Sequence, residues 1–200
     1  MGIQELYTLL ARDATRNEMI VADVLEAVGT GRSPLVLTER TEHLELLVAA
    51  LQEHVDNVIV LRGAMSARQR RQAAEQIAAT AGEERVIVAT GRYAGEGFDD
   101  PRLDTLFLAL PISWRGTLQQ YVGRLHREST GKRLVRVFDY VDDGVPMLER
   151  MYRKRVRGYR ALGYTVSRSS SPRCARRDEP GQSASAPQDP VLLGGALAAT

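Results

Sequence analysis

The chain has 200 residues, of which 44% are apolar and 26% are charged, and its formal net charge is +2. A chain of this size can bury one sizeable core, and the small net charge does not by itself indicate a nucleic-acid-binding protein. The single cysteine, Cys174, excludes an internal disulfide framework and a cysteine-rich zinc site.

Segments with helix and strand periodicity alternate along the chain. Residues 3–28 predict two helices, the second opened by a capping box at Thr15 and Glu18 and ended by glycines at 29 and 31. Ser66 and Gln69 form a second capping box. Strands are expected at 35–37, 58–61, 86–89, 103–110 and 134–140, and further helices at 42–53, 66–80, 117–127 and 145–157.

This alternation predicts an α/β fold with a parallel sheet covered by helices on both faces. Ligands of such sheets gather at the carboxyl ends of the strands. The pattern divides the chain into a helical linker segment at 1–30, an α/β domain at 31–166 and a tail at 167–200. Small and polar residues dominate the tail, so we expect it to be disordered.

The most informative stretch is residues 120–127, which read QYVGRLHR. It places Arg124 and Arg127 three residues apart, just after Gly123 and one helical turn beyond Gln120. Side chains at i and i+3 of a helix lie on one face, and arginine offers a planar charged fork that suits phosphate oxygens. The pair is therefore well shaped to stabilise the charge that builds during phosphoryl transfer.

A glycine-rich loop follows the strand expected at 86–89. Residues 86–99 read VIVATGRYAGEGFD, so that Gly91, Gly97 and Asp99 come after Thr90. Glycines let the backbone approach a ligand closely and make N–H groups available to an anion. An ordinary glycine-rich turn after a core strand is the alternative, which the paired arginines further along the chain make the weaker one.

These two stretches resemble the motifs of superfamily 2 DEAD/DEAH-type helicases. The pattern Gln-x-x-Gly-Arg-x-x-Arg at 120–127 is the last signature motif of that family, and Ala-Thr at 89–90 followed by Gly-x-Asp at 97–99 is similar to the fifth. From about residue 3 to residue 166 the chain is similar to the second RecA-like domain of these helicases. The resemblance therefore implies a RecA-like sheet.

The resemblance also implies roles for individual residues. The catalytic group would be the arginine fingers Arg124 and Arg127 with Gln120 as a polar sensor, and the nucleotide contacts would be Gly97, Asp99 and Gly123. Contacts to a nucleic-acid backbone would come from Thr38, Arg40, Arg62, Gly63, Thr90 and Gly91. For Thr38 and Arg40, an ordinary strand end before a helix start has equal weight.

The chain does not contain the motifs that hold phosphates and Mg²⁺ in such a motor. A phosphate loop requires Gly-x-x-x-x-Gly-Lys-Ser/Thr, and the run at Lys132 fails because His126 replaces the first glycine and Arg133 follows the lysine. The resemblance implies ATP with Mg²⁺ shared with a Walker-bearing RecA-like domain, with no metal ligands from this chain. We expect DNA or RNA as the track and no hydrolysis by the chain alone.

Other interpretations stay open at this stage. A non-catalytic nucleic-acid-binding module, or a regulatory module that docks on an ATPase domain, could keep the same residues. Residues 150–160 carry six cations and no acidic residue, which indicates either a solvated helix face or an edge that contacts phosphates. The N-terminus lacks a signal-peptide pattern and no apolar run reaches the ~20 residues of a membrane span, so we expect a cytoplasmic protein without membrane contact.

Overall fold

The computed structural model describes residues 2–63, 65–91, 100–112, 118–130, 132, 134–142, 144–168 and 190–196. These residues form one seven-stranded sheet in the order β2-β3-β1-β4-β5-β7-β6. The strands are β1 (Pro34–Thr38), β2 (Val58–Leu61), β3 (Val86–Thr90), β4 (Thr105–Leu108), β5 (Leu134–Tyr140), β6 (Thr165–Arg168) and β7 (Pro190–Ala196). The first five are parallel to one another, which confirms the predicted α/β class and parallel sheet.

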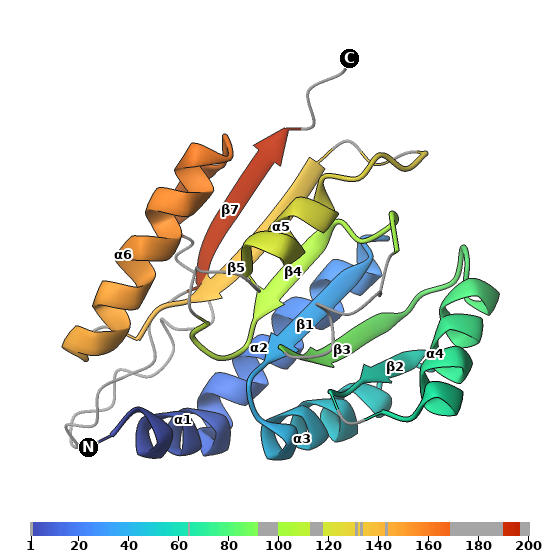
Figure 1. The fold of residues 1–200 in the computed structure, drawn as a ribbon, viewed down its shortest axis with the longest axis horizontal. Helices are drawn as coiled ribbons and strands as arrows, with labels where there is room; N and C mark the ends of the chain where they lie inside the picture. The colour runs from blue at the N-terminus through green and yellow to red at the C-terminus, as the bar shows by residue number, and fades with distance from the viewer. Residues whose placement is uncertain are drawn as a thin grey trace.

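Helices cover both faces of this sheet (Figure 1). They are α1 (Ile3–Arg12), α2 (Ala14–Gly29), α3 (Thr41–Gln52), α4 (Ala67–Ala79), α5 (Gln119–Leu125) and α6 (Pro146–Ala161). Apolar residues of α2 and α3 pack in the core of one face, and those of α4, α5 and α6 pack in the core of the other. A third, smaller cluster joins α1 to the start of α6.

The central strands supply both cores because successive side chains of a strand point to opposite faces. Val36 and Val88 belong to the core of α2 and α3, whereas Leu37 and Ala89 belong to the core of α4, α5 and α6. Every position of β1 and β3 is buried. This double burial accounts for the continuous apolar runs in the sequence, which show no polar alternation.

One of the two predicted capping boxes is confirmed and the other is wrong. Ser66 Oγ accepts from the Gln69 amide at 3.3 Å, and Gln69 Oε1 accepts from the Ser66 amide at 2.8 Å. At α2, however, Asp13 is the cap, because its Oδ1 accepts from the Arg16 amide at 3.0 Å and the helix begins at Ala14. Aspartate caps helices better than threonine does, so the helix starts before Thr15.

Residues 190–196 of the tail form the strand β7. β7 pairs antiparallel with β5 over seven residues, from Leu134↔Ala196 to Tyr140↔Pro190, and with β6 on its other side. Its sequence includes the apolar run Val-Leu-Leu at 191–193, and pairing there covers what would otherwise be an open sheet edge. The rest of the tail, 169–189 and 197–200, lies outside the described residues.

A buried ion pair attaches α6 to the sheet. Arg155 and Asp139 are each 1% exposed, and the guanidinium meets the carboxylate at two N···O distances of 2.7 and 2.8 Å. Tyr159 Oη donates to the same carboxylate at 3.3 Å. Arg155 belongs to the basic run of the sequence, but the helix turns it inward, away from the solvated cations beside it.

We predict that Arg155→Ala lowers the free energy of unfolding by about 3–5 kcal/mol, because it leaves the Asp139 carboxylate buried without its partner. Arg153→Ala is the matched control, since Arg153 is exposed and pairs with Glu149 on the helix surface. Its cost should stay below about 1 kcal/mol. Urea denaturation followed by circular dichroism measures both values, and equal costs for the two variants would contradict the assigned role of the buried pair.

Candidate functional site

Residues predicted from three separate motifs meet at the carboxyl edge of the sheet. The register pairs Thr38 of β1 with Thr90 of β3, and β2 ends beside β3. The Gly91 amide donates to the Thr38 carbonyl at 3.0 Å, and the Gly63 amide donates to Thr90 Oγ1 at 3.2 Å. Because parallel strands end at the same edge, segments far apart in sequence form one continuous surface there.

Thr38 itself is held inside the protein by a neutral histidine. Its hydroxyl lies 2.9 Å from His43 Nδ1, and His43 Nε2 lies 2.9 Å from Asn17 Oδ1. The Asn17 amide nitrogen donates to the Ala11 carbonyl, so its oxygen faces the ring and Nε2 carries the proton. Thr38 and His43 are both 0% exposed, so the Thr38 hydroxyl is used internally.

Two arginines and a glycine are at least partly exposed at this edge, where Glu39 is exposed as well. Arg40 Nη2 donates to the Gln4 carbonyl of α1 at 2.6 Å, and Arg62 Nη1 pairs with Glu45 of α3 at 3.0 Å. Both guanidinium groups are only partly buried, and Gly63 is exposed. These positively charged side chains and the Gly63 backbone can therefore face an anionic ligand, while Thr38 shapes the backbone beneath them.

Gly91 opens the glycine-rich loop in close contact with an acidic side chain. A Cβ atom at this position would lie 2.4 Å from Glu39 Oε1, so any larger residue would have to displace that carboxylate. Gly97 and Asp99, the predicted nucleotide contacts in this loop, lie outside the described residues, as does all of 92–99. The structure describes only the residues at the two ends of this loop, Gly91 and Asp100.

The helix that carries the paired arginines is anchored to the first of these ends. Tyr121, Val122 and Leu125 bury one side of α5 at 0–1% exposure, and Tyr121 Oη donates to the Gly91 carbonyl at 3.2 Å. On its other side, Gln120 and Gly123 are exposed and Arg124 is half-buried. The apolar residues therefore fix α5 on the sheet and turn the predicted catalytic group away from the core.

The sequence predicts that the two arginines share one continuous helix, and this prediction is wrong. α5 ends at Leu125 with His126 as its C-cap, so Arg127 follows the helix. Its amide donates to the Arg124 carbonyl at 3.1 Å, a tighter i to i+3 bond typical of a last helical turn. Arg127 is exposed, and the turn keeps its backbone in a fixed relation to Arg124.

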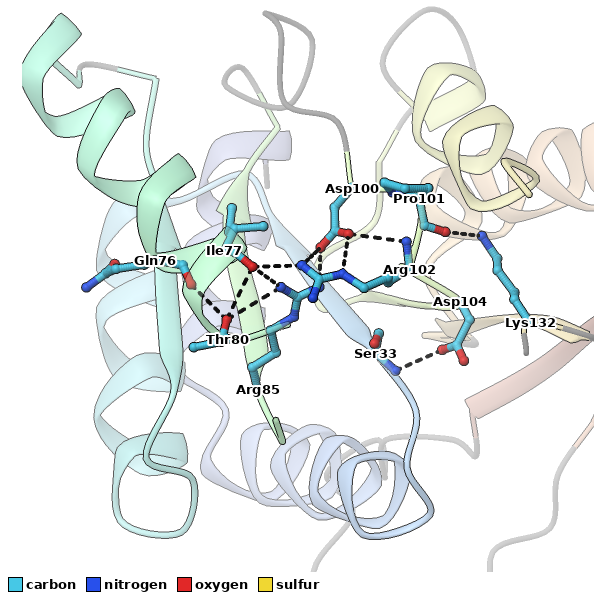
Figure 2. Close-up of polar contacts among 10 residues, drawn as sticks. All are labelled: Ser33, Gln76, Ile77, Thr80, Arg85, Asp100, Pro101, Arg102, Asp104 and Lys132. Atoms are coloured by element: carbon cyan, nitrogen blue, oxygen red, sulfur yellow. Dashed lines mark hydrogen bonds and ion pairs between the residues drawn. The ribbon is translucent and has the colours of Figure 1, made fainter. Parts of the chain in front are cut away.

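The far end of the glycine-rich loop is held by a buried cluster of charges, shown in Figure 2. Asp100 is 4% exposed and accepts from the guanidinium groups of Arg85 and Arg102. Both arginines also donate to the Ile77 carbonyl of α4, each at 2.7 Å. Since Asp100 directly follows Asp99, this cluster fixes the position at which the loop rejoins the sheet.

Lys132 joins this loop end to the paired arginines. Its Nζ donates to the Pro101 carbonyl at 3.0 Å and to the Arg127 carbonyl at 2.8 Å (Figure 2 shows the first contact). Burial lowers the pKa of the Lys132 ammonium. Lys132 does not belong to a phosphate loop, but it connects the two predicted motifs at the end of α5.

A cavity of about 350 Å³ lies beside this cluster, near the amino ends of β1, β3 and β4. Arg32, Arg85, Arg102 and Lys132 contribute cations to its lining, but Asp104 pairs with Arg32 at 3.5 Å and Asp100 pairs with Arg85 and Arg102. These cations are therefore balanced by carboxylates of the protein itself. We interpret them as structural groups that support the loop.

The N-terminal helices hold the chain that leads from β4 toward α5. Arg16 of α2 is 1% exposed and donates from Nε and Nη2 to the Ala109 carbonyl, each at 3.3 Å. Tyr7 Oη of α1 donates to the Pro111 carbonyl, and Arg155 donates to the Ile112 carbonyl at 3.1 Å. Sequence reasoning missed Arg16, although its spacing of four residues from Ile20 places it on the apolar face of α2.

Within the described ranges, no group of three or more His, Cys, Asp or Glu side chains has an arrangement that could hold a metal ion. None of the helices in the same ranges combines the length and apolarity needed to cross a bilayer.

A family model for the helicase conserved C-terminal domain matches residues 17–129, more than half of the chain. The chain is 26% identical over 145 residues to transcript termination protein A18 of fowlpox virus, covering 70% of this chain and 30% of that protein. It is 31% identical over 129 residues to transcript termination protein A18 of cowpox virus, and this match covers 62% of this chain and 26% of the cowpox protein. The chain thus spans less than a third of the length of these relatives.

The fold is similar to two solved structures. The crystal structure of T4 UvsW matches this chain with a TM-score of 0.64 at 17% sequence identity. The match covers 80% of this chain and 35% of the UvsW chain. The crystal structure of the C-terminal part of the Fun30 ATPase domain matches with a TM-score of 0.60 at 14% sequence identity. That match covers 77% of this chain and 54% of the Fun30 chain. At these identities the likeness is one of fold, and it confirms the RecA-like architecture that the motifs implied.

We predict that His43 makes stability fall as the pH drops below about 6.5. Burial, and secondly the charge of Arg16, lower the pKa of His43 to about 4. Below pH ~6.5 the unfolded histidine gains a proton that the folded one does not accept until about pH 4, so about 3 kcal/mol is lost over this window. His43→Gln should remove this part of the pH dependence.

Urea unfolding at several pH values between about 7 and 4.5 measures the effect as a difference between wild type and variant. His54→Gln is the control, because His54 is exposed. An unchanged pH dependence in His43→Gln would show that the buried Thr38–His43 contact does not hold the ring neutral.

We also predict that Lys132→Met loosens both segments that Lys132 joins. Loss of two hydrogen bonds, each worth about 1 kcal/mol net, should speed amide exchange about five-fold or more at residues 100–103 and 126–128. Hydrogen–deuterium exchange with mass spectrometry measures this change. Lys154→Met, at an exposed site on α6, should leave both segments unchanged, and faster exchange in only one of the two segments would argue against a connecting role.

Proposed function

We propose, on the premise that this chain belongs to the family of helicase conserved C-terminal domains, that it is the C-terminal half of an ATP-dependent helicase or translocase. One observation carries the proposal. The exposed side of α5, with Arg124 and Gln120, is tied through Tyr121 to the start of the glycine-rich loop, and the turn after it is tied through Lys132 to the loop's end. Such an arrangement would let a change at the arginines reach the loop.

Arg124 and Arg127 are proposed as arginine fingers for a nucleotide held mainly by another domain. Neither side chain is buried in the core, and guanidinium groups suit the oxygens of a phosphoryl group undergoing transfer. Gln120, exposed one turn before Arg124, would report on the same phosphate, and Gly123 would allow close approach. Gly97 and Asp99 are proposed to contact the nucleoside.

ATP with Mg²⁺ would supply the phosphoryl group and the metal charge, held by a Walker-bearing RecA-like domain. Arg124 and Arg127 suit one side of such a site, because guanidinium groups are good donors to phosphate oxygens. This chain would add transition-state stabilisation and would not itself coordinate the metal.

The carboxyl edge is proposed to hold the backbone of DNA or RNA. Arg40 and Arg62 present positive charge and guanidinium donors beside the exposed Gly63, while Thr90 and Gly91 form the floor beside them. Contacts of this kind fix position without reading sequence. The relatives named as transcript termination proteins support a nucleic-acid substrate.

The proposal predicts negligible ATP hydrolysis by the isolated chain and nucleic-acid-stimulated hydrolysis once a Walker-bearing RecA-like domain is supplied in trans. Arg127→Ala should then lower kcat by about 10³-fold or more, as loss of an arginine finger does. Phosphate release measured with saturating ATP gives this value. Arg68→Ala, an exposed arginine on α4, is the control and should leave kcat unchanged.

Two outcomes would contradict the proposal. Robust hydrolysis by the isolated chain that disappears in Arg127→Ala would show a complete active site within this chain. Stimulated hydrolysis that is insensitive to Arg124→Ala and Arg127→Ala, together with intact nucleic-acid binding, would instead favour a non-catalytic binding module.

A further inference from the structure

Five cations form a stripe along the exposed side of α6. Arg155, the sixth cation of this run, points inward, while the others are all exposed. We call them the α6 basic stripe: Arg150, Arg153, Lys154, Arg157 and Arg160. Their spacing of three and four residues places them on one face of the helix, opposite the buried residues Leu148 and Tyr159.

Intramolecular interactions do not account for this stripe. In the described part of the chain, its recorded ion pairing is limited to Arg153 with Glu149 at 3.0 Å. The helix dipole favours cations in the last turn, where Arg160 stands, but not in the first half of the helix, where Arg150 stands. Like charges at i+3 and i+4 also repel one another and destabilise the helix.

The start of α6 places the first residues of the stripe near the same edge as the predicted nucleic-acid contacts. β5 ends at Tyr140 on the carboxyl edge, and α6 starts shortly after, at Pro146. Figure 1 shows α6 at the side of the molecule opposite α4 and β2. A nucleic-acid strand that lies across the carboxyl ends of β1 and β3 could therefore continue along α6.

The dimensions and chemistry of the stripe suit a polyphosphate chain. From Arg150 to Arg160 the helix rises about 15 Å, which matches roughly four phosphates at about 3.4 Å per base pair. Four of the five side chains are arginines, whose planar fork can bind two phosphate oxygens at once. The stripe includes no exposed aromatic side chain for base stacking, so it fits a backbone better than bases.

We propose that the α6 basic stripe binds the phosphodiester backbone of a nucleic acid, as a second contact surface beside the carboxyl edge. The identity of this ligand rests on the proposed function, whereas the surface itself is defined by the exposed charges of α6. Such a surface extends the footprint of the domain without adding sequence specificity. It would increase affinity mainly at low salt, because each bound phosphate releases counterions.

The test compares two triple variants of the full chain that carry the same net charge. Arg150→Gln/Lys154→Gln/Arg157→Gln removes three cations from the stripe, and Arg12→Gln/Arg68→Gln/Arg71→Gln removes three exposed cations from α1 and α4. Each variant changes the formal charge from +2 to −1. Fluorescence anisotropy with a labelled single strand and a labelled duplex, each as DNA and as RNA, gives Kd between about 50 and 200 mM salt.

We expect the stripe variant to bind at least ten-fold more weakly at low salt than the control variant does. Its slope of log K against log salt should become shallower by about 2 for a single strand or roughly 3 for a duplex. The probe with the larger change identifies the form that lies on α6. The thermal midpoint of the stripe variant should not fall, because the substitutions remove like-charge repulsion.

Equal losses in the two variants would overturn the proposal, since they would reflect net charge alone. Unchanged binding by the stripe variant would overturn it while leaving the proposed function intact. If polyglutamate displaced the labelled strand from wild type as readily as unlabelled nucleic acid does, the stripe would be a site for an acidic protein instead. If wild type bound none of the probes at low salt, both this inference and the proposed function would fail.

Discussion

The burial of parallel strands on both faces is the constraint on which the rest of this structure depends. β1 and β3 are covered by helices on each side, so their backbones must pair with neighbours and their side chains must alternate between two apolar cores. Once the strands are parallel, all of their carboxyl ends lie at one edge. The proximity of Thr38, Gly63 and Gly91 is a direct consequence of that register.

Arginine has two distinct uses in this protein, and the surroundings of each side chain separate them. Arg16, Arg85 and Arg155 are at most 3% exposed, and each forms an ion pair with an aspartate and donates to a backbone carbonyl. Arg16 and Arg155 hold carbonyls of the chain that follows β4, and Arg85 holds a carbonyl in the last turn of α4. Arg127 and the exposed cations of α6 instead face solvent, where a ligand can reach them.

The two predicted motifs form one mechanical unit because their ends are tied together. Tyr121 links α5 to the carbonyl at the start of the glycine-rich loop, and Lys132 links the turn after α5 to the residue that follows the loop's end. The segment that leads toward α5 is in turn held by Tyr7, Arg16 and Arg155 from three different helices. The N-terminal helices therefore support the same region that the motifs define.

The sequence alone determined the fold class, the order of the first five strands along the chain and the family, because these depend on local periodicity and on short motifs. It left open the cases in which a pattern has two physical outcomes. Composition does not indicate that residues 190–196 pair with the free side of β5. Spacing predicts one helix through Arg127, yet the helix ends at Leu125.

Only the tertiary structure decided which charges are structural and which are exposed. Arg155 and Arg157 are two residues apart and chemically identical, but one is buried against Asp139 and the other is exposed. His43 has no recognisable motif, and its role follows only from the contacts that bring Asn17 and Thr38 to its two nitrogens. Such roles are set by partners distant in sequence, because the free energy of a charged or polar group depends on what replaces its water.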